Sequence, residues 1–301
     1  MPSSPKMHAD ELDIDEALVL RMVSAQFPQW ADLSVELVDS AGTSNAMYRL
    51  GAELVVRIPR IPGAAEDIGK EHAWLPRLAP RLPVAVPAPV GLGTPVDGCP
   101  WPWSVLRWLN GANPEAGHSP QPGLLARDLA SFTTALHRAD PTGGPASYRN
   151  ESLSDRDGAV RRALAALADV IPVEVATSAW EAALRAPSHP GPPIWIHADL
   201  QPGNLLVDGH GRLSAVIDFG CAGLGDPAVD LLPAWYVLPA AVRDAFRTAV
   251  GADDAAWARG TGWALSVALM ELDYYRGTNP RMVRTARYVV GELLADRATK
   301  S

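Results

Sequence analysis

The sequence predicts an α+β protein in which a small sheet-rich lobe precedes a larger, mainly helical lobe. The stretch "LSVELVDSAGTSNAMYRL" is typical of two strands around a Gly/Ser turn. After Gly111 amphipathic helical spacing dominates, and a short hairpin that carries His, Asp and Asn interrupts the helices. We place residues 1–108 in the first lobe and residues 109–301 in the second.

The first lobe is expected to combine three or more strands with packed helices. "IDEALVLRMVSAQF" puts Ile14, Leu18, Met22 and Ala25 on one helical face. The strand–turn–strand unit follows, and "ELVVRIP" predicts a third short strand. "AEDIGKEHAWLPRLA" returns to helical spacing, and "PWSVLRWLNG" predicts an apolar strand that ends at a Gly turn. This order favours a small mixed sheet with a helix packed on it.

The second lobe is expected to be helical on both sides of a hairpin. "QPGLLARDLASFTTALHRAD" predicts an amphipathic helix. The hairpin runs from "NLLV" through the turn "DGHG" to "LSAVIDFG". The other predicted helices lie near residues 155–168, 173–186, 227–237, 239–250, 254–275 and 280–297.

Composition excludes several classes of protein. A net charge of -8 argues against a nucleic-acid binder, which would carry a basic patch. Cys99 and Cys221 offer neither a disulfide framework nor metal-ligand spacing. No apolar run approaches the roughly 20 residues that span a bilayer, and the N-terminus lacks the apolar core of a signal peptide. We therefore expect a cytoplasmic protein that binds neither nucleic acid nor membrane and is a monomer or a homodimer.

The hairpin carries the strongest chemical signal. In "WIHADLQPGNLLV", His197, Asp199 and Asn204 stand at short fixed intervals, and Asp218 closes the next strand in "VIDFG". Oxygen ligands of this kind suit Mg²⁺, and a phosphoryl-transfer site needs an Asp for the acceptor hydroxyl and an Asn and an Asp for the metal. Single Asp and Asn residues usually cap turns. The combined pattern H-x-D-x-x-x-x-N followed by I-D-F-G favours the catalytic interpretation.

The blocks "HADLQPGNLLV", "VIDFG" and "GDPAVDLLPAW" resemble the signature blocks of the aminoglycoside phosphotransferase family. The resemblance covers about residues 35–235 and implies a protein-kinase-like bilobal fold, with a small antiparallel-sheet N-lobe and a larger, mainly helical C-lobe. It also implies an enzyme that moves the γ-phosphoryl group of ATP or GTP to a hydroxyl of a small molecule with the help of Mg²⁺. The family's link to antibiotic resistance comes with this resemblance.

The resemblance implies roles for the residues of these blocks. Asp199 matches the catalytic base or acceptor-positioning group, and Asn204 and Asp218 match the ligands of Mg²⁺. His197 matches a residue that supports the loop, so we expect it to be buried and hydrogen-bonded. In "GDPAVDL", we expect Asp230 to anchor the catalytic loop and Asp226 to cap the helix that follows.

The first lobe is expected to hold the nucleotide. The Gly/Ser/Thr turn matches the place where the family covers the phosphates, and the hydroxyls of Thr43 and Ser44 would add donors. Tyr48 has two interpretations, a contact with adenine or an ordinary strand aromatic in the core. Backbone groups around Arg107 to Leu109 are candidates for hydrogen bonds to adenine at the hinge.

Arg57 departs from the family's pattern, which places a Lys on this strand. Glu71 is its candidate partner on the next helix. Arg keeps the charge and changes the geometry, because its guanidinium is a planar fork. Three interpretations remain: Arg57 performs the role of the Lys, the site is weakened and binds nucleotide without catalysis, or Arg57 is a surface charge. The first is favoured because Asp199, Asn204 and Asp218 are all present.

The acceptor site is the least determined part. Glu271, Asp273 and Tyr274 in "LMELDYYRGTNP" are candidates, and a solvated helix face would explain the same acids. An aminoglycoside-type antibiotic or a related natural product is the leading acceptor. A macrolide, a metabolic sugar or an amino alcohol stays open, as does a nucleotide-binding pseudokinase. A P-loop kinase is excluded because G-x-x-x-x-G-K-[ST] is absent.

Overall fold

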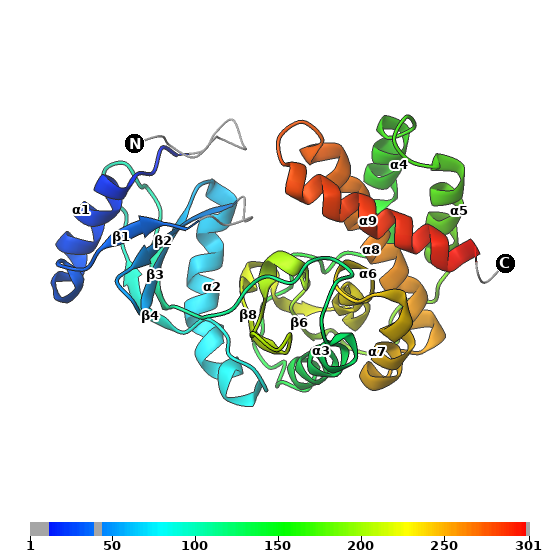
Figure 1. The fold of residues 1–301 in the computed structure, drawn as a ribbon, viewed down its shortest axis with the longest axis horizontal. Coiled ribbons are helices and arrows are strands. Elements are labelled where there is room, and N and C mark those ends of the chain that lie inside the picture. Colours follow the sequence, from blue (N-terminus) through cyan, green and yellow to red (C-terminus); the bar gives the residue numbers. More distant parts are fainter. Residues whose placement is uncertain (1–11, 39–43, 299–301) are drawn as a thin grey trace. The chain divides into compact units, whose positions relative to one another are not determined.

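The computed structural model describes residues 12–38 and 44–298, and these residues divide into two compact units (Figure 1). The first unit contains the described residues up to Pro80, together with Ala85–Asn110 and Val216–Gly220. The second contains Arg81–Val84, Gly111–Ala215 and the described residues from Cys221 onward. The metal-ligand candidate Asp218 therefore belongs to the first unit, although the hairpin that precedes it belongs to the second.

An antiparallel sheet forms the centre of the first unit. Its strand order among the described residues is β1-β2-β3-β5-β4. The register places Tyr48 opposite Val56 and Arg57 opposite Met47 and Ser104. Because side chains alternate between the two faces of a strand, Tyr48 and Val56 face one side and Arg57 faces the other. The strands are β1 (Val35–Leu37), β2 (Asn45–Leu50), β3 (Leu54–Pro59), β4 (Pro89–Gly93) and β5 (Trp103–Arg107).

Two helices cover the two faces of this sheet (Figure 1). Helix α1 (Glu16–Gln26) begins where the side chain of Asp15 accepts a hydrogen bond from the backbone N–H of Leu18, at 2.8 Å. Its buried face packs into an apolar core with side chains from β2, β3 and β5. Helix α2 (Pro62–Leu78) starts with Pro62, whose fixed φ suits the first helical turn. Glu71 lies on the buried side of α2.

The second unit is built mainly from helices. Helix α8 (Asp254–Tyr275) is buried over most of its circumference, as expected of a core helix. Two glycines let its neighbours approach closely: a Cβ at Gly260 would lie 2.8 Å from Leu231, and one at Gly262 would lie 2.7 Å from Ala183. The other helices are α3 (Pro122–His137), α4 (Asp157–Ala166), α5 (Val173–Leu184), α6 (Pro233–Tyr236), α7 (Arg243–Val250) and α9 (Pro280–Ala298).

Short strands between these helices carry the predicted catalytic loop. Strand β6 (Ile194–Ile196) pairs in antiparallel fashion with β9 (Gly223–Gly225). Strand β7 (Leu205–Val207) pairs with β8 (Leu213–Val216), which confirms the predicted hairpin. The catalytic loop therefore leaves the end of β6 and enters β7 through the 3₁₀ turn Pro202–Asn204.

Most of the predicted helices are present, although those near residues 155–168 and 239–250 begin as 3₁₀ helices, Leu153–Arg156 and Ala240–Val242. The prediction of one helix over residues 227–237 is wrong: a 3₁₀ helix, Pro227–Leu231, is followed by the single turn of α6. Pro233 lacks a backbone N–H and cannot continue a helix that begins at residue 227. In the part of the chain that the structure describes, no helix combines the length and the apolarity needed to cross a bilayer.

Candidate active site

The catalytic loop begins with a backbone that a buried carboxylate holds in place. Ala198 has a φ of 68°, in the left-handed region that a residue with a Cβ rarely adopts. Asp230 is fully buried; its Oδ1 accepts a hydrogen bond from the N–H of Ala198 at 2.8 Å, and its Oδ2 accepts one from the N–H of His197 at 3.0 Å. These bonds confirm that Asp230 anchors the loop.

His197 and Asp226 also take the supporting positions that the sequence predicts. His197 is fully buried, its ring meets that of Phe132 edge to face, and its Nδ1 accepts the N–H of Asp199 at 3.3 Å. Asp226 caps the 3₁₀ helix Pro227–Leu231 by accepting the N–H of Ala228 at 2.9 Å. Neither side chain is therefore free for chemistry.

The structure brings Asp199 and Asn204 together. The Asn204 Nδ2 donates to the backbone oxygen of Asp199 at 2.8 Å and to its Oδ2 at 2.7 Å. This arrangement turns the amide oxygen of Asn204 away from Asp199, and that oxygen has no hydrogen-bond partner among the described residues. The Asp199 side chain is 23% exposed, so an incoming hydroxyl group can reach it.

Two further residues hold Asp199, and sequence reasoning assigned a role to neither. The Arg149 Nη1 lies 3.2 Å from Asp199 Oδ1, and the Gln201 Nε2 donates to the same oxygen at 3.1 Å. Gln201 lies inside the motif "WIHADLQPGNLLV", two residues after Asp199, and this spacing is a signal that could have indicated its contact with Asp199. Arg149 lies 50 residues upstream in an irregular segment, where no pattern marks it.

Glu271 belongs to the support of the catalytic loop. Its Oε1 accepts from Gln201 at 2.7 Å, and its Oε2 accepts from the hydroxyl of Tyr236 at 2.9 Å. Burial raises the pKa of Glu271 to about 7; the hydrogen bonds from Gln201 and Tyr236 oppose this shift, and the nearby Asp199 adds to it. Each oxygen accepts a hydrogen bond from a neighbour of the loop, and a role for Glu271 toward the acceptor stays a prediction.

The three acceptor candidates on α8 differ in position. At about 100° per residue, Asp273 lies roughly 200° around the helix from Glu271, whereas Tyr274 lies within about 60° of it. Tyr274 is 57% exposed and packs edge to face against Tyr275. A role for Asp273 and Tyr274 in binding the acceptor stays a prediction.

In the first unit Arg57 is buried and paired. Its side chain is 4% exposed, its Nη1 lies 2.5 Å from Glu71 Oε2, and its Nη2 lies 3.1 Å from Asp218 Oδ1. With its amide oxygen facing Arg57, Asn45 accepts from Nη2 at 3.0 Å and from Nε at 3.2 Å. The alternative in which Arg57 is a surface charge is therefore wrong. Burial raises the pKa of Glu71, and the positive charge of Arg57 opposes that shift.

Asp218 sits in a strained turn that α2 helps to hold. Its φ of 59° is left-handed, and its Oδ1 also accepts the N–H of Gly220 at 3.3 Å. Lys70 donates to the carbonyl oxygen of Gly220 and pairs with Asp67 Oδ1 at 3.1 Å. The Asp218 side chain is 43% exposed, and its Oδ2 has no partner among the described residues. One carboxylate oxygen is therefore available as a ligand.

The other residues predicted to bind the nucleotide are Thr43, Ser44 and Tyr48. Thr43 lies outside the described residues, and the carbonyl oxygen of Ser44 accepts the N–H of Arg60 at 2.9 Å. Tyr48 is 3% exposed within the core against α1, and its hydroxyl donates to the carbonyl oxygen of Ile14 at 2.9 Å. A ring buried on that face presents no surface to a base, so the contact with adenine is corrected to a core role.

One backbone N–H of the hinge segment, residues 107–109, stays a candidate for a hydrogen bond to adenine. The N–H of Arg107 donates to Ala88 at 2.9 Å, and the N–H of Trp108 donates to Glu53 at 2.8 Å. The Arg107 side chain is turned to an exposed pair with Glu53. Among the described residues, the N–H of Leu109 has no partner, so it is the available donor of the three.

Each unit offers one oxygen donor of the kind that Mg²⁺ prefers. In the second unit it is the amide oxygen of Asn204, and in the first it is Oδ2 of Asp218. No group of three or more His, Cys, Asp or Glu side chains in the described chain could hold a metal ion. Mg²⁺ is usually held by one or two protein groups together with substrate phosphates and water, so the chemistry of each oxygen suits it.

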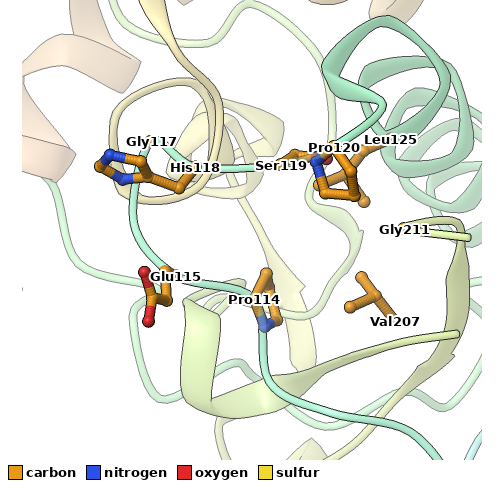
Figure 2. Close-up of a pocket in the computed structure, with 9 residues that line it drawn as sticks. All are labelled: Pro114, Glu115, Gly117, His118, Ser119, Pro120, Leu125, Val207 and Gly211. Carbon is orange, nitrogen blue, oxygen red and sulfur yellow. The ribbon is translucent and has the colours of Figure 1, made fainter. Parts of the chain in front are cut away.

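A separate hollow of about 510 Å³ opens on the second unit (Figure 2). It lies between the loop Pro114–Pro120, the start of α3 and the β7–β8 hairpin. None of the predicted site residues lines it. The site is therefore defined by the hydrogen-bonded loop rather than by this hollow.

An anchored His-x-Asp loop and a buried pair of a cation with Glu are both features of kinase-like phosphotransferases. The model of the phosphotransferase enzyme family matches residues 37–263, and the chain belongs to that family. The expected family, fold and enzyme class are confirmed. A comparison with curated proteins finds no sequence match.

Solved structures share the fold across almost the whole chain. The GDP complex of aminoglycoside 2'-phosphotransferase-IIIa is 21% identical, with a TM-score of 0.71, and the match covers 94% of this chain and 100% of that one. The macrolide 2'-phosphotransferase of Brachybacterium faecium, solved as an apoenzyme, is 23% identical, with a TM-score of 0.61 and coverage of 91% and 97%. The ADP-bound aminoglycoside phosphotransferase APH(2'')-Ib is 17% identical, with a TM-score of 0.62 and coverage of 93% and 97%.

Proposed function

We propose that this phosphotransferase moves the γ-phosphoryl group of ATP or GTP to a hydroxyl of an aminoglycoside-type antibiotic or a related natural product. The proposal depends mainly on one observation, the contacts and exposure of Asp199. Its loop is anchored by Asp230, its carboxylate is fixed by Asn204, and its side chain is partly exposed. Such an activity in the cytoplasm would inactivate the antibiotic and give resistance.

The nucleotide is proposed to bind mainly through the first lobe, residues 1–108. Buried Arg57, fixed by Glu71, would neutralise phosphate charge in place of the usual Lys. The N–H of Leu109 would bond the base, and the turn with Thr43 and Ser44 would cover the phosphates. The GDP and ADP complexes of the solved relatives support nucleotide use without choosing between ATP and GTP.

The catalytic and acceptor-binding lobe is proposed to be residues 109–301. Asn204 and Asp218 would hold Mg²⁺, which when bound supplies charge neutralisation at the phosphates. Asp199 would accept a hydrogen bond from the acceptor hydroxyl, orient its oxygen for in-line attack and take its proton. The partly buried hydrogen bonds that join Gln201, Glu271 and Tyr236 would keep the loop rigid while the acceptor binds.

Two alternatives to this function can be distinguished by the same experiment. The macrolide phosphotransferases among the solved relatives support a macrolide acceptor. A nucleotide-binding pseudokinase would explain Arg57 as a degraded site. The intact pair between Arg57 and Glu71 favours the enzyme, because active kinases keep a cation–Glu pair at this position.

A phosphoryl-transfer screen tests the proposal. The purified protein is incubated with ATP or GTP, with and without Mg²⁺, and with panels of aminoglycosides, macrolides, sugars and amino alcohols, and mass spectrometry identifies the acceptor that gains a phosphoryl group. Asp199→Asn is the test variant. Asp169→Asn, at a carboxylate that is 72% exposed, is the matched control. Transfer by the wild type and the control alone supports the proposal, and nucleotide binding without transfer across all panels contradicts it.

A further inference from the structure

We propose that Arg149 is a positioning residue that locks the Asp199 carboxylate in one orientation, so that Oδ2 takes the proton of the acceptor hydroxyl. This inference rests on the proposed function, since it concerns the same reaction. It adds a residue outside every recognisable motif of the sequence. It also distinguishes between two oxygens that are chemically equivalent in a free carboxylate.

A single nitrogen of Arg149 makes the contacts on which the inference depends. Nη1 donates to the carbonyl oxygen of Ala198 at 2.9 Å and lies 3.2 Å from Asp199 Oδ1. The same nitrogen lies 3.7 Å from the sulfur of Cys221. The Arg149 side chain is only 12% exposed, so this cation is held by protein groups rather than by water. The charge-assisted contacts of a buried guanidinium restrict the positions of the cation and of its partners.

Arg149 completes a clamp around the left-handed residue of the loop. The N–H of Ala198 donates to Asp230 at 2.8 Å, and its carbonyl oxygen accepts from Arg149. A non-glycine residue with a φ of 68° persists only where its surroundings determine the conformation. Two charged side chains therefore bind the peptide groups on either side of the strained residue, and the backbone that carries Asp199 follows from that geometry.

The two oxygens of the Asp199 carboxylate have different partners. Among the described residues, Oδ1 lies 3.2 Å from the charged Nη1 of Arg149 and accepts a hydrogen bond from Gln201, whereas Oδ2 accepts one from the side chain of Asn204. A cation lowers the proton affinity of the oxygen beside it. Oδ2 is therefore the oxygen that takes the proton.

The assignment gives a balanced step. The O–H bond of the acceptor breaks and its proton moves to Asp199 Oδ2. The electron pair of the acceptor oxygen forms the new bond to the γ-phosphorus. The bond from the γ-phosphorus to the bridging oxygen breaks, and its electron pair leaves with the nucleoside diphosphate. Arg149 stays bound to Oδ1 throughout and does not touch the acceptor.

The test compares Arg149→Met with Arg149→Lys. Met keeps part of the packing and removes the charge and the donors, whereas Lys keeps a charge and can donate from one nitrogen, as Nη1 does. We expect Arg149→Met to lower kcat about 100-fold, the loss typical of a small misplacement of a catalytic group, with the nucleotide KM nearly unchanged. Arg149→Lys should recover a large part of the lost kcat.

Arg243→Met is the matched control. Arg243 is a buried arginine of the same unit, its side chain is 4% exposed, and it pairs with Glu292 and Asp296 away from Asp199. We expect this control to lower the melting temperature and to keep kcat near the wild-type value at a temperature where it is folded. A kcat for Arg149→Met close to the wild type, an equal loss of kcat in the control, or no recovery with Lys would each overturn the inference.

A measurement that needs no catalytic turnover distinguishes failure of this inference from failure of the proposed function. Thermal unfolding of Arg149→Met, Asp199→Asn and the double variant forms a double-mutant cycle. We expect the two destabilisations to be non-additive, because each variant removes one partner of the same contact. Additive values overturn the positioning contact. Non-additive values in a protein that phosphorylates no acceptor would support the contact and contradict the proposed function together with the assignment of Oδ2.

Discussion

Removing the carboxylate of Asp230 would show how much the anchored catalytic loop contributes to stability. In Asp230→Ala the buried N–H groups of Ala198 and His197 lose their acceptor. His137 also loses a partner, since its Nε2 lies 3.1 Å from Asp230 Oδ2. Water cannot replace the carboxylate easily, because Asp230 is fully buried.

The expected cost follows from these donors. Leaving a buried donor unsatisfied costs about 1–3 kcal/mol, so the two backbone groups together cost about 4 kcal/mol. For a protein of more than about 250 residues, each kcal/mol lowers Tm by roughly 2 °C. We therefore expect Asp230→Ala to lower Tm by about 8 °C in a thermal scan. Release of the left-handed Ala198 should also lower kcat, because Asp199 follows it in the chain.

Asp253→Ala provides the control for the same chemical change. Asp253 is exposed and caps α8 by accepting the N–H of Ala256 at 2.7 Å. Loss of such a cap costs about 1 kcal/mol, or roughly 2 °C. If Asp230→Ala melted no lower than Asp253→Ala, or kept full kcat, the argument that this carboxylate holds the loop would be refuted.

Three further predictions follow from the same contacts. Because burial raises the pKa of Glu271 from 4.5 to about 7, the folded state binds a proton that the unfolded state has released between these values, so stability falls as pH rises through this window. Glu271→Gln should therefore gain Tm relative to the wild type between about pH 5 and pH 8, and a pH-independent difference would contradict the raised pKa. Arg57→Lys loses the fork that reaches Asn45 and Asp218 and should raise the nucleotide KM about tenfold, whereas an unchanged KM would show that the charge alone suffices. Ala198→Val places a β-branched side chain at a buried left-handed position and should cost more than about 2 kcal/mol in denaturant unfolding; a smaller loss would show that the loop relaxes.

The sequence predicted those parts that local pattern encodes. Helix α8 has the predicted bounds, 254–275, because its apolar residues and its cap at Asp253 are contiguous in the chain. The pairing of Arg57 with Glu71 was expected because these residues match the family's pattern of a strand cation paired with a helix Glu. The anchoring role of Asp230 was expected because the block "GDPAVDL" resembles a block of the same family.

The parts that sequence reasoning missed depend on contacts between distant segments. Arg149 reaches Asp199 from an irregular segment, and Tyr236 reaches Glu271 from another helix. No local spacing reports such pairs. Tyr48 shows the same limit. The alternation of side chains along β2 predicts which residues share a face of the sheet, but which face α1 covers depends on its packing.

The most direct test of the central claim is the rate of Mg²⁺-dependent phosphoryl transfer by the wild type and by Asp199→Asn, with the acceptor that the screen identifies. We expect Asp199→Asn to lower kcat about 100-fold or more while the nucleotide KM stays near the wild-type value, because a general base supplies about that factor. Equal rates for the two proteins would contradict the assignment of Asp199 as the group that takes the acceptor proton.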